Sequence, residues 1–444
     1  MARPVAGAAR PTDGPAFSAL VIEWQRLHGR HTLPWQNTRD PYRVWLSEIM
    51  LQQTQVGTVL AYFDRFLQRF ADVRALAAAP LDDVLALWSG LGYYSRARNL
   101  HRCAQAVVAE HGGQFPRSSV VLATLPGIGR STAAAIAAFC FGERVAILDG
   151  NVKRVLTRVL GFEGDLAEAA QERALWKQAT RLLPDDGIER YTQGLMDLGA
   201  TLCMQRSPSC LLCPAQSLCV ADSTQTQQRF PVKTRKLKRG TREHVWLWLH
   251  WRDQVWLVQR PPTGVWAALW SLPEFDSMAV FDAASASWPG EAQALPSFRH
   301  TLTHLDWTLH PLRWTLPART SASRVAELVR ACRAGAGSRR KPRSPPVCLR
   351  RCASCCRAEA ILHVPAAAQK VVDQLQPHDR VGQLHQLLLG DGRDRQDLAP
   401  AVGDPAGVVE TMRREKRLRA TSLQRSGGAG QAAHCFEQSR CWRA

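Results

Sequence analysis

The chain has 444 residues, and 57 Lys and Arg against 38 Asp and Glu give a formal net charge of +19. This length predicts two or three domains, and this charge favours a polyanionic partner such as nucleic acid. No apolar run approaches the roughly 18 residues of a membrane-spanning helix, and the N-terminus lacks the apolar stretch of a secretory signal. We therefore expect no membrane association. We expect the thirteen cysteines to lie in a reducing compartment and to bind a metal or cluster rather than form disulfides.

The composition changes sharply near residue 318. Residues 318–444 carry +12 of the net charge, seven of the cysteines and only two aromatic side chains. A segment so poor in aromatic residues is a weak core former, so we expect a disordered basic tail. The abrupt shift favours a change of reading frame. The alternative is a natural basic tail that adds DNA affinity or binds metal through its cysteines.

The rest of the chain divides into a helical part and a strand-rich part. Residues 1–15 are expected to form a flexible leader, residues 16–221 a helical domain, residues 222–243 a basic linker, and residues 244–317 a small β-rich domain. Asp40 and Pro41 predict the start of a helix that runs through Val56. Further helices are predicted at 58–70, 80–89, 95–111, 131–141, 152–160, 168–182 and 188–202. Aromatic and β-branched runs predict strands at 245–251, 255–259, 266–272 and 308–314.

Glu48 lies on the first predicted helix, with Val44 and Leu51 one turn away on either side. These neighbours place its carboxylate beside an apolar stripe, where loss of water raises the pKa and suits a general acid. A glutamate at the edge of the stripe that reaches water is the alternative. Gln52 and Gln53, further along the same predicted helix, offer amide groups of the kind that read base edges.

Paired aromatic residues, Tyr93 and Tyr94, stand beside Arg96 and Arg98. Aromatic rings can wedge or stack on bases while arginines hold phosphates. The pattern is therefore typical of a nucleic-acid contact. A tyrosine pair taken alone is more often part of a core, and that alternative stays open.

The segment Leu-Pro-Gly-Ile-Gly-Arg-Ser-Thr at 125–132 lies between two helical stretches. Gly127 and Gly129 let the backbone turn sharply and expose N–H groups at a helix N-terminus, which can hold a phosphate without reading sequence. This is the helix-hairpin-helix pattern. An ordinary turn between two helices is the alternative.

Asp149 ends an apolar run and stands before a helix. A carboxylate in that place can cap the helix. It can also be held against a reacting sugar, and the sequence does not decide between the two roles.

Four cysteines, Cys203, Cys210, Cys213 and Cys219, fall within seventeen residues. Four thiolates so close in sequence can close around one metal centre, either a [4Fe–4S] cluster or a structural zinc ion. The spacing does not choose between these two. Four unrelated buried cysteines are the remaining alternative.

These segments, in this order, resemble the helix-hairpin-helix DNA glycosylases, and more narrowly the adenine DNA glycosylases of the MutY type. The resemblance runs from about Phe17 to Pro317. It is carried by the four cysteines and by residues 33–35, 47–54, 90–94, 125–132 and 148–153.

The resemblance implies a monofunctional DNA glycosylase of base excision repair that removes adenine opposite 8-oxoguanine or guanine. Glu48 would protonate N7 of the extruded adenine, and Asp149 would stabilise the oxocarbenium-like sugar. The related endonuclease III type has a nucleophilic lysine where Ser131 stands here, which argues against strong lyase activity. The resemblance also makes one [4Fe–4S] cluster the expected occupant of the four cysteines.

The resemblance further implies a set of DNA-contacting residues. Trp35, Ser131 and Gln193 resemble residues of the adenine pocket, Gln53 and Tyr93 resemble residues inserted around 8-oxoguanine, and Gln52, Gly127, Gly129 and Lys153 complete the expected set.

The second domain is similar to the Nudix-like module of this family, through residues 264–274 and 298–304. Thr303 and His304 match its lesion-reading loop. The glutamate-rich signature of Nudix hydrolases is absent, so we expect no pyrophosphohydrolase activity. The expected fold is multidomain, an all-α glycosylase core followed by an α+β Nudix-like domain. Because the atypical stretch begins after Pro317, we expect this domain to lack its closing strand and helix.

The expected partner is double-stranded DNA with adenine opposite 8-oxoguanine or guanine, bound by a monomer. The expected location is the bacterial cytoplasm, at the nucleoid, or the nucleus or mitochondrion of a eukaryote. A DNA-binding protein that has lost catalysis is one alternative, but Glu48 and Asp149 are both present. A glycosylase for another mismatch, such as thymine opposite guanine, is disfavoured by the Nudix-like domain.

Overall fold

The computed structural model describes residues 14–234, 238–252, 254–335 and 359–363. All of them belong to the first of two units into which the chain divides, Met1–Leu389. The predicted leader and most of the predicted tail lie outside the described residues. Within the described part of the chain, no helix is long and apolar enough to cross a membrane.

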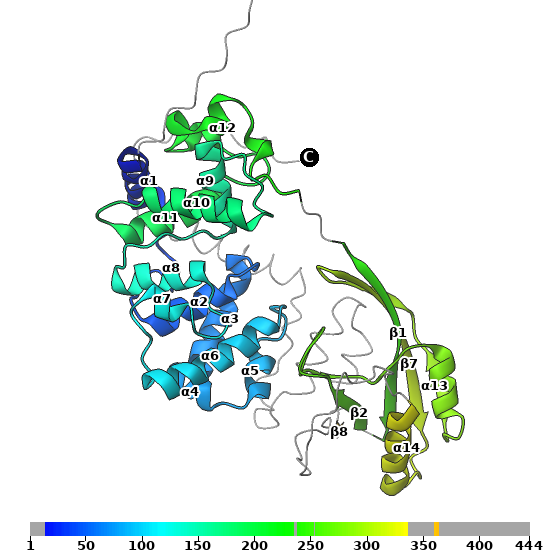
Figure 1. Cartoon of the computed structure of the whole chain (residues 1–444). Coiled ribbons are helices and arrows are strands. Elements are labelled where there is room, and N and C mark those ends of the chain that lie inside the picture. The colour runs from blue at the N-terminus through cyan, green and yellow to red at the C-terminus, as the bar shows by residue number, and fades with distance from the viewer. Residues whose placement is uncertain (1–13, 235–237, 253, 336–358, 364–444) are drawn as a thin grey trace, which may run out of the picture. The chain divides into compact units, whose positions relative to one another are not determined.

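The first part of the chain is helical, as predicted (Figure 1). Its helices are α1 (Gly14–His28), α2 (Pro41–Met50), α3 (Val56–Arg69), α4 (Val73–Ala78), α5 (Leu81–Leu87), α6 (Ser95–His111), α7 (Ser119–Leu122), α8 (Arg130–Phe141), α9 (Gly150–Leu160), α10 (Ala169–Arg181), α11 (Ile188–Thr201) and α12 (Val220–Ser223). Short 3₁₀ turns cover Cys210–Leu212, Gln216–Leu218 and Gln227–Arg229. The seven later helices that the sequence predicts correspond to α3, α5, α6, α8, α9, α10 and α11.

The alanine-rich helix α8 lies between two hydrophobic cores. Its residues Ala133, Ile136, Ala137 and Cys140 belong to the core that α2, α3 and α6 help to form. Its residues Ala134, Ala135 and Ala138 belong to the core built with α1, α9, α10 and α11. Small side chains all around the helix let neighbours approach closely on both sides. In Figure 1, α8 lies between α11 on one side and α2 on the other.

Helix α2 begins as predicted and ends earlier. Asp40 caps it by accepting a hydrogen bond from the N–H of Tyr42 at 2.9 Å, and Pro41 opens the helix. The predicted helix through Val56 is wrong, because α2 ends at Met50 and Gln53 adopts a left-handed φ of 57°. Gln52 and Gln53 therefore lie in the turn between α2 and α3 and not on a helix.

Arg96 explains why α2 ends there. Its buried guanidinium donates to the carbonyl oxygens of Ile49 and Met50, at 3.1 and 2.8 Å, and to that of Gln52. These are carbonyls at a helix C-terminus, which have no partner within the helix. The sequence interpretation that Arg96 holds a phosphate is wrong, since this side chain is used inside the protein.

The second part of the chain forms an eight-stranded mixed sheet with two helices. Its elements are β1 (Gly240–Trp251), β2 (Gln254–Gln259), β3 (Trp270–Ser271), β4 (Glu274–Phe275), α13 (Met278–Ser285), β5 (Glu291–Ala294), β6 (Phe298–Thr301), β7 (Leu305–Leu316), α14 (Ala322–Gly335) and β8 (Glu359–His363). The strand order is β3-β2-β1-β7-β5, with β4, β6 and β8 paired to β1, β7 and β2. The long strands β1 and β7 run parallel, from Gly240 opposite Leu305 to Trp251 opposite Leu316.

Strand β1 buries both of its faces. Val245, Leu247 and Leu249 face the core that contains α13 and α14, whereas Trp246 and Trp248 face a second core on the other side of the sheet. This alternation is the two-residue period of a strand. The sheet thus has packed side chains on both faces, and the α+β fold is confirmed.

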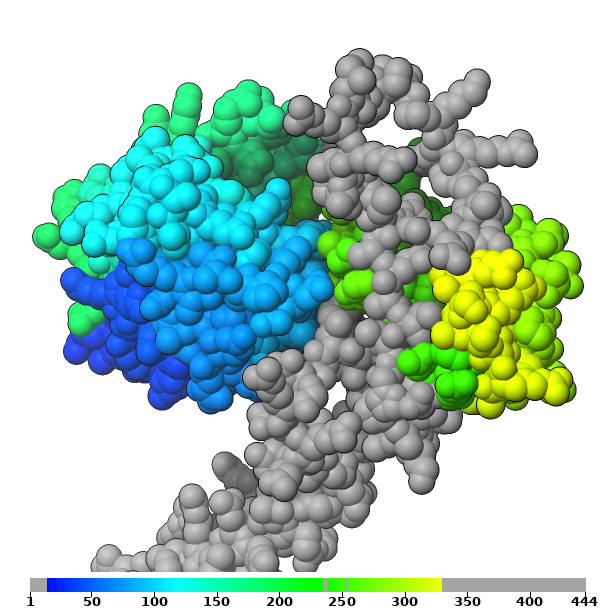
Figure 2. All heavy atoms as spheres, turned by 90° about the horizontal axis from the view of Figure 1, so that it is seen from below, coloured from blue at the N-terminus to red at the C-terminus, as the bar shows by residue number. Residues whose placement is uncertain are grey.

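The sheet domain extends past Pro317, where the sequence interpretation ended it. Helix α14 packs Val325, Leu328 and Val329 into the core beneath β1. In Figure 2 its yellow atoms lie against the lime-green atoms near α13. Strand β8 pairs antiparallel with β2. A closing helix is therefore present. The lack of aromatic residues concealed it, although aliphatic side chains spaced three and four apart are enough to build such a face.

Candidate active site

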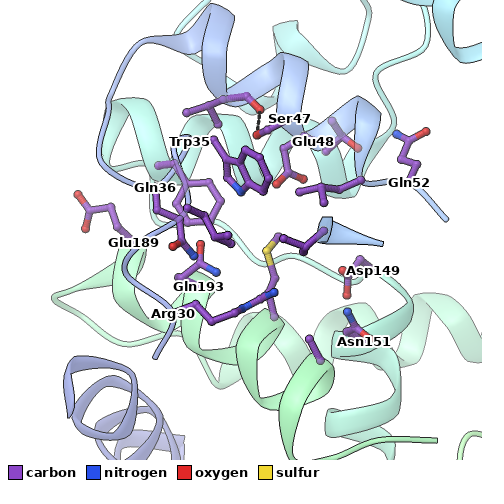
Figure 3. A pocket seen from close by; sticks show the side chains of 18 of the residues that line it. Arg30, Trp35, Gln36, Ser47, Glu48, Gln52, Asp149, Asn151, Glu189 and Gln193 are labelled. Atoms are coloured by element: carbon purple, nitrogen blue, oxygen red, sulfur yellow. Dashed lines mark hydrogen bonds between the residues drawn. The ribbon is translucent and has the colours of Figure 1, made fainter. Parts of the chain in front are cut away.

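A cleft of about 1570 Å³ opens in the helical part of the chain. Its walls come from the segment before α2, from α2 and the turn after it, from the start of α8, and from α9 and α11 (Figure 3). Of the predicted site residues, Trp35, Glu48, Gln52, Gln53, Ser131, Asp149 and Gln193 line this one cleft.

Glu48 reaches the cleft from α2, between the buried residues Ser47 and Ile49. Removal of water from its carboxyl group, together with the smaller effect of the negative charge of Asp149, raises the pKa to about 8. Glu48 therefore carries a proton at neutral pH. A protonated carboxyl group in a cleft is suited to donate that proton to a bound molecule.

Asp149 reaches the same cleft from the N-terminus of α9. Its carboxylate accepts a hydrogen bond from the N–H of Val152 at 2.7 Å. Burial raises the pKa of this group, but the N–H groups of Val152 and Asn151 and the charge of Arg154 act in the opposite direction. The two carboxyl groups thus differ in environment. Glu48 has only influences that keep its proton, whereas Asp149 has several that favour the anion.

The first turn of α8 is hydrogen-bonded to the loop that carries Asp149. The hydroxyl of Ser131 accepts a hydrogen bond from the N–H of Leu148 at 3.0 Å, so α8 is tied to the residue before Asp149. Gly127 has a φ of 78°, and a Cβ there would stand 2.5 Å from Asn99. Gly129 begins α8 and faces open space. Both glycines are exposed outside the cleft.

The other predicted residues lie outside the cleft. Lys153 pairs with Glu172 at 2.6 Å. Tyr93 stands in the loop before α6 with a φ of 50° and is 46% exposed. Thr303 and His304 are exposed in the turn between β6 and β7. The hydroxyl groups of Tyr93 and Thr303 lie 3.1 Å apart.

Sequence reasoning missed several side chains of the cleft. Arg30, Gln36, Asn151 and Glu189 line it and are labelled in Figure 3. Asn151, two residues after Asp149, and Gln36, next to Trp35, could have been found by extending motifs already noticed. Arg30 offers no local signal, because its partner Asp197 lies 167 residues away in the sequence.

The four cysteines converge on a second, smaller cavity. Cys203, Cys210, Cys213 and Cys219 all line it, together with the buried residue Arg158, whose guanidinium donates to the sulfur of Cys203 at 3.3 Å. Burial raises the pKa of Cys213 to about 12 and that of Cys219 to about 11. Within the described ranges, no group of three or more His, Cys, Asp or Glu is arranged to hold a metal ion.

Comparison with known proteins agrees with this geometry. Residues 46–180 match the model of the HhH-GPD superfamily of base excision DNA repair proteins, and residues 244–334 match that of the NUDIX domain. The chain is 36% identical over 302 residues to an adenine DNA glycosylase of Buchnera aphidicola subsp. Baizongia pistaciae, covering 67% of this chain and 85% of that one. It is 43% identical over 218 residues to an adenine DNA glycosylase of Mus musculus, covering 47% and 42%. A solved thermostable thymine-DNA glycosylase is 29% identical with a TM-score of 0.43, covering 48% and 97%.

A helical fold with two unlike carboxyl groups in one cleft, together with the match to the base excision repair superfamily, defines a DNA N-glycosylase. Within that class, the chain belongs to the adenine DNA glycosylase family of the MutY type. The NUDIX match ends at residue 334, in α14, which agrees with the packing of that helix.

Proposed function

We propose that this protein removes adenine opposite 8-oxoguanine or guanine in double-stranded DNA, with Glu48 as the general acid and Asp149 as the stabilising anion. The observation that supports this proposal is that the two carboxyl groups line one cleft in different surroundings: burial and a neighbouring carboxylate keep the proton on Glu48, whereas N–H groups and neighbouring positive charges oppose the effect of burial on Asp149. Paired carboxyl groups with different proton affinities are the device by which glycosidic bonds are broken.

The proposed reaction breaks the bond between N9 of adenine and C1′ of the sugar. The bond electrons leave with the base, and Glu48 donates a proton to N7 so that the base leaves as a neutral molecule. The carboxylate of Asp149 stabilises the positive charge that develops on the sugar. Water then adds at C1′ and gives an abasic site, and the proton that the water loses returns to the Glu48 carboxylate. Ser131 is no amine nucleophile, which supports a monofunctional glycosylase.

Residues at the turn after α2 and outside the cleft suit contacts with the DNA that surrounds the extruded base. The exposed glycines Gly127 and Gly129 stand where a phosphate can approach the N-terminus of α8. We propose that the bases next to the place left by the extruded adenine are contacted by Gln52 and Gln53, in the turn after α2, and by the exposed ring of Tyr93. Thr303 and His304 are proposed to read 8-oxoguanine. Lys153 pairs with Glu172, so we propose that it acts through long-range charge alone.

We propose that the four cysteines hold one [4Fe–4S] cluster. The four cysteines line one cavity, where burial and their mutual repulsion oppose free thiolates. Cationic iron offsets both effects. The buried guanidinium of Arg158 also suits the net negative charge of a thiolate-bound cluster. The cluster would supply structure to the loop after α11, and such thiolates require the reducing compartment that the sequence predicts.

The test is single-turnover base release by the full chain, acting as a monomer, from duplexes with A opposite 8-oxoguanine, A opposite G, and T opposite G. Release of adenine from the first two and none of thymine supports the proposal. Thymine release would favour the other glycosylase specificity. Tight binding to all three duplexes without release of any base would favour a DNA-binding protein that has lost catalysis.

A further inference from the structure

A buried carboxylate beneath the cleft has no role in the proposed reaction. Asp197, on α11, is 0% exposed. Its oxygens accept hydrogen bonds from the backbone N–H and the Nε of Arg30, at 3.0 and 2.7 Å. One of them also accepts from Nε2 of Gln193 at 2.9 Å, one helical turn away. Burying an ion pair costs desolvation free energy, so stability alone does not account for this pair. Its hydrogen bond to Gln193, a residue of the cleft, points instead to a role in the cleft.

This contact fixes which way the amide of Gln193 points. A carboxylate bound to a guanidinium can only accept hydrogen bonds, so the amide atom that faces Asp197 has to be the NH₂ group. The carbonyl oxygen is then turned away from Asp197. Because Gln193 lines the cleft (Figure 3), its carbonyl oxygen is the amide atom left to accept a hydrogen bond from a molecule bound there.

A second amide side chain, that of Gln36, lines the same cleft. Both of its polar atoms are buried without a hydrogen-bond partner among the described residues. Buried amide groups without partners are costly in a folded protein. A shift of this side chain toward a bound polar molecule would give its donor and its acceptor a partner.

We propose that Asp197 and Arg30 are positioning residues that hold the Gln193 oxygen toward the cleft, so that the enzyme selects purines with an amino group at C6 over purines with a carbonyl there. The proposal rests on the proposed function. Adenine carries an N6 amine that donates to the Gln193 oxygen. Hypoxanthine carries a carbonyl oxygen at C6. This oxygen and the Gln193 oxygen are both acceptors, so no hydrogen bond can form between them.

The experiment measures single-turnover base release from duplexes that contain adenine, hypoxanthine or unsubstituted purine opposite 8-oxoguanine. The main variant is Asp197→Asn, whose side-chain amide can donate to Gln193 and so permits the opposite orientation. Each substrate is compared with itself between wild type and variant, which cancels differences in intrinsic reactivity. Asp83→Asn is the matched control, since it breaks the ion pair with Arg69 outside the cleft.

In Asp197→Asn, adenine release should fall about tenfold while release of hypoxanthine is unchanged or faster. Purine release should change little, because purine has no group at C6. Equal losses for all three substrates would show a merely structural role and overturn the proposal.

A second variant covers the case in which Asp197→Asn does not fold. Gln193→Met keeps the length of the side chain and removes the acceptor, so it should slow adenine about tenfold and leave purine unchanged. An equal loss for purine overturns the proposal. A wild-type chain that releases no adenine from any duplex contradicts the proposed function itself, whereas normal wild-type release with parallel losses in the variants contradicts only this inference.

Discussion

The carboxylate of Asp149 and the backbone N–H of Val152 form a 2.7 Å hydrogen bond at the start of α9. The sequence allows Asp149 to be either a helix cap or a group of the active site, and the structure combines the two, because the capping carboxylate also lines the cleft. The helix N-terminus holds the side chain in place, and its N–H groups oppose the rise in pKa that burial causes. The carboxyl group of Asp149 is thereby positioned at the cleft before any substrate binds.

Two substitutions separate these roles of Asp149. Asp149→Asn keeps a capping oxygen and loses the charge, so base release should fall roughly 10²-fold or more with little change in melting temperature. Asp149→Ala should lose the same activity and also about 1 kcal/mol of stability. Base-release kinetics and thermal melts measure the two effects. Full activity in the Asn variant would refute the electrostatic role.

Glu48→Gln should bind mismatched DNA normally, and its rate of adenine release should fall roughly 10²-fold or more. The amide keeps the shape of the side chain but has no acidic proton for the leaving base. Binding titrations and single-turnover release measure the two properties. Glu110→Gln, an exposed change on α6, is the control and should match wild type. Near-normal turnover in the Glu48 variant would end the assignment.

The raised pKa of Glu48 predicts a characteristic pH dependence. Base release should decline as pH rises through about 8, where this carboxyl loses its proton. The folded-state pKa lies above the ordinary value near 4.5, so the stability contributed by the protonated group is complete below that value and is lost as pH rises through about 8. Glu48→Gln should therefore melt higher than wild type in alkaline buffer. A rate that stays flat across this range would show that another group donates the proton.

Purified protein should be brown and absorb broadly near roughly 400 nm. Cys213→Ser should lose this absorbance and become sensitive to protease in the loop after α11. Cys103→Ala, a change at a buried cysteine outside the set, should keep both colour and loop. A colourless wild-type protein with one zinc per chain would contradict the iron–sulfur proposal. It would still agree with the prediction that the four cysteines bind a metal.

Two truncations test where the sheet domain ends. A chain that stops after Pro317 lacks α14 and loses the burial of Val325, Leu328 and Val329, worth roughly 1.5–3 kcal/mol each. A chain that stops after His363 keeps α14 and β8. Both should release adenine opposite guanine, since Glu48 and Asp149 lie far upstream. Only the shorter one should show a destabilised sheet domain in thermal melts and limited proteolysis, and equal melting would contradict the packing role of α14.

Elements whose signals are local could be predicted from the sequence. Asp40 followed by proline marks the start of α2, and the spacing of Glu48 against Val44 predicts its low-dielectric surroundings; both agree with the structure. The end of α2 could not be predicted, because it depends on Arg96, more than forty residues later. The same holds for Gln193. Its place in the cleft follows from the resemblance, but its orientation depends on Asp197 and Arg30, and Arg30 has no motif of its own.

Composition misled where packing needed only aliphatic residues. The stretch after Pro317 has only two aromatic side chains, a composition that predicts no core. Yet α14 contributes three aliphatic residues at helical spacing to the core under β1. A low aromatic content argues against a new core, not against one helix that completes a core built elsewhere.

The two carboxyl groups of the cleft belong to different halves of the helical domain, and α8 contributes to the packing of both. Glu48 stands on α2, which packs on one side of α8, and Asp149 begins α9, whose apolar face belongs to the core on the other side. Packing against one alanine-rich helix therefore links the placements of the two carboxyl groups. A larger side chain at Ala134 or Ala137, both buried, would disturb one of these cores. The geometry of the cleft thus depends on positions of α8 that do not line it.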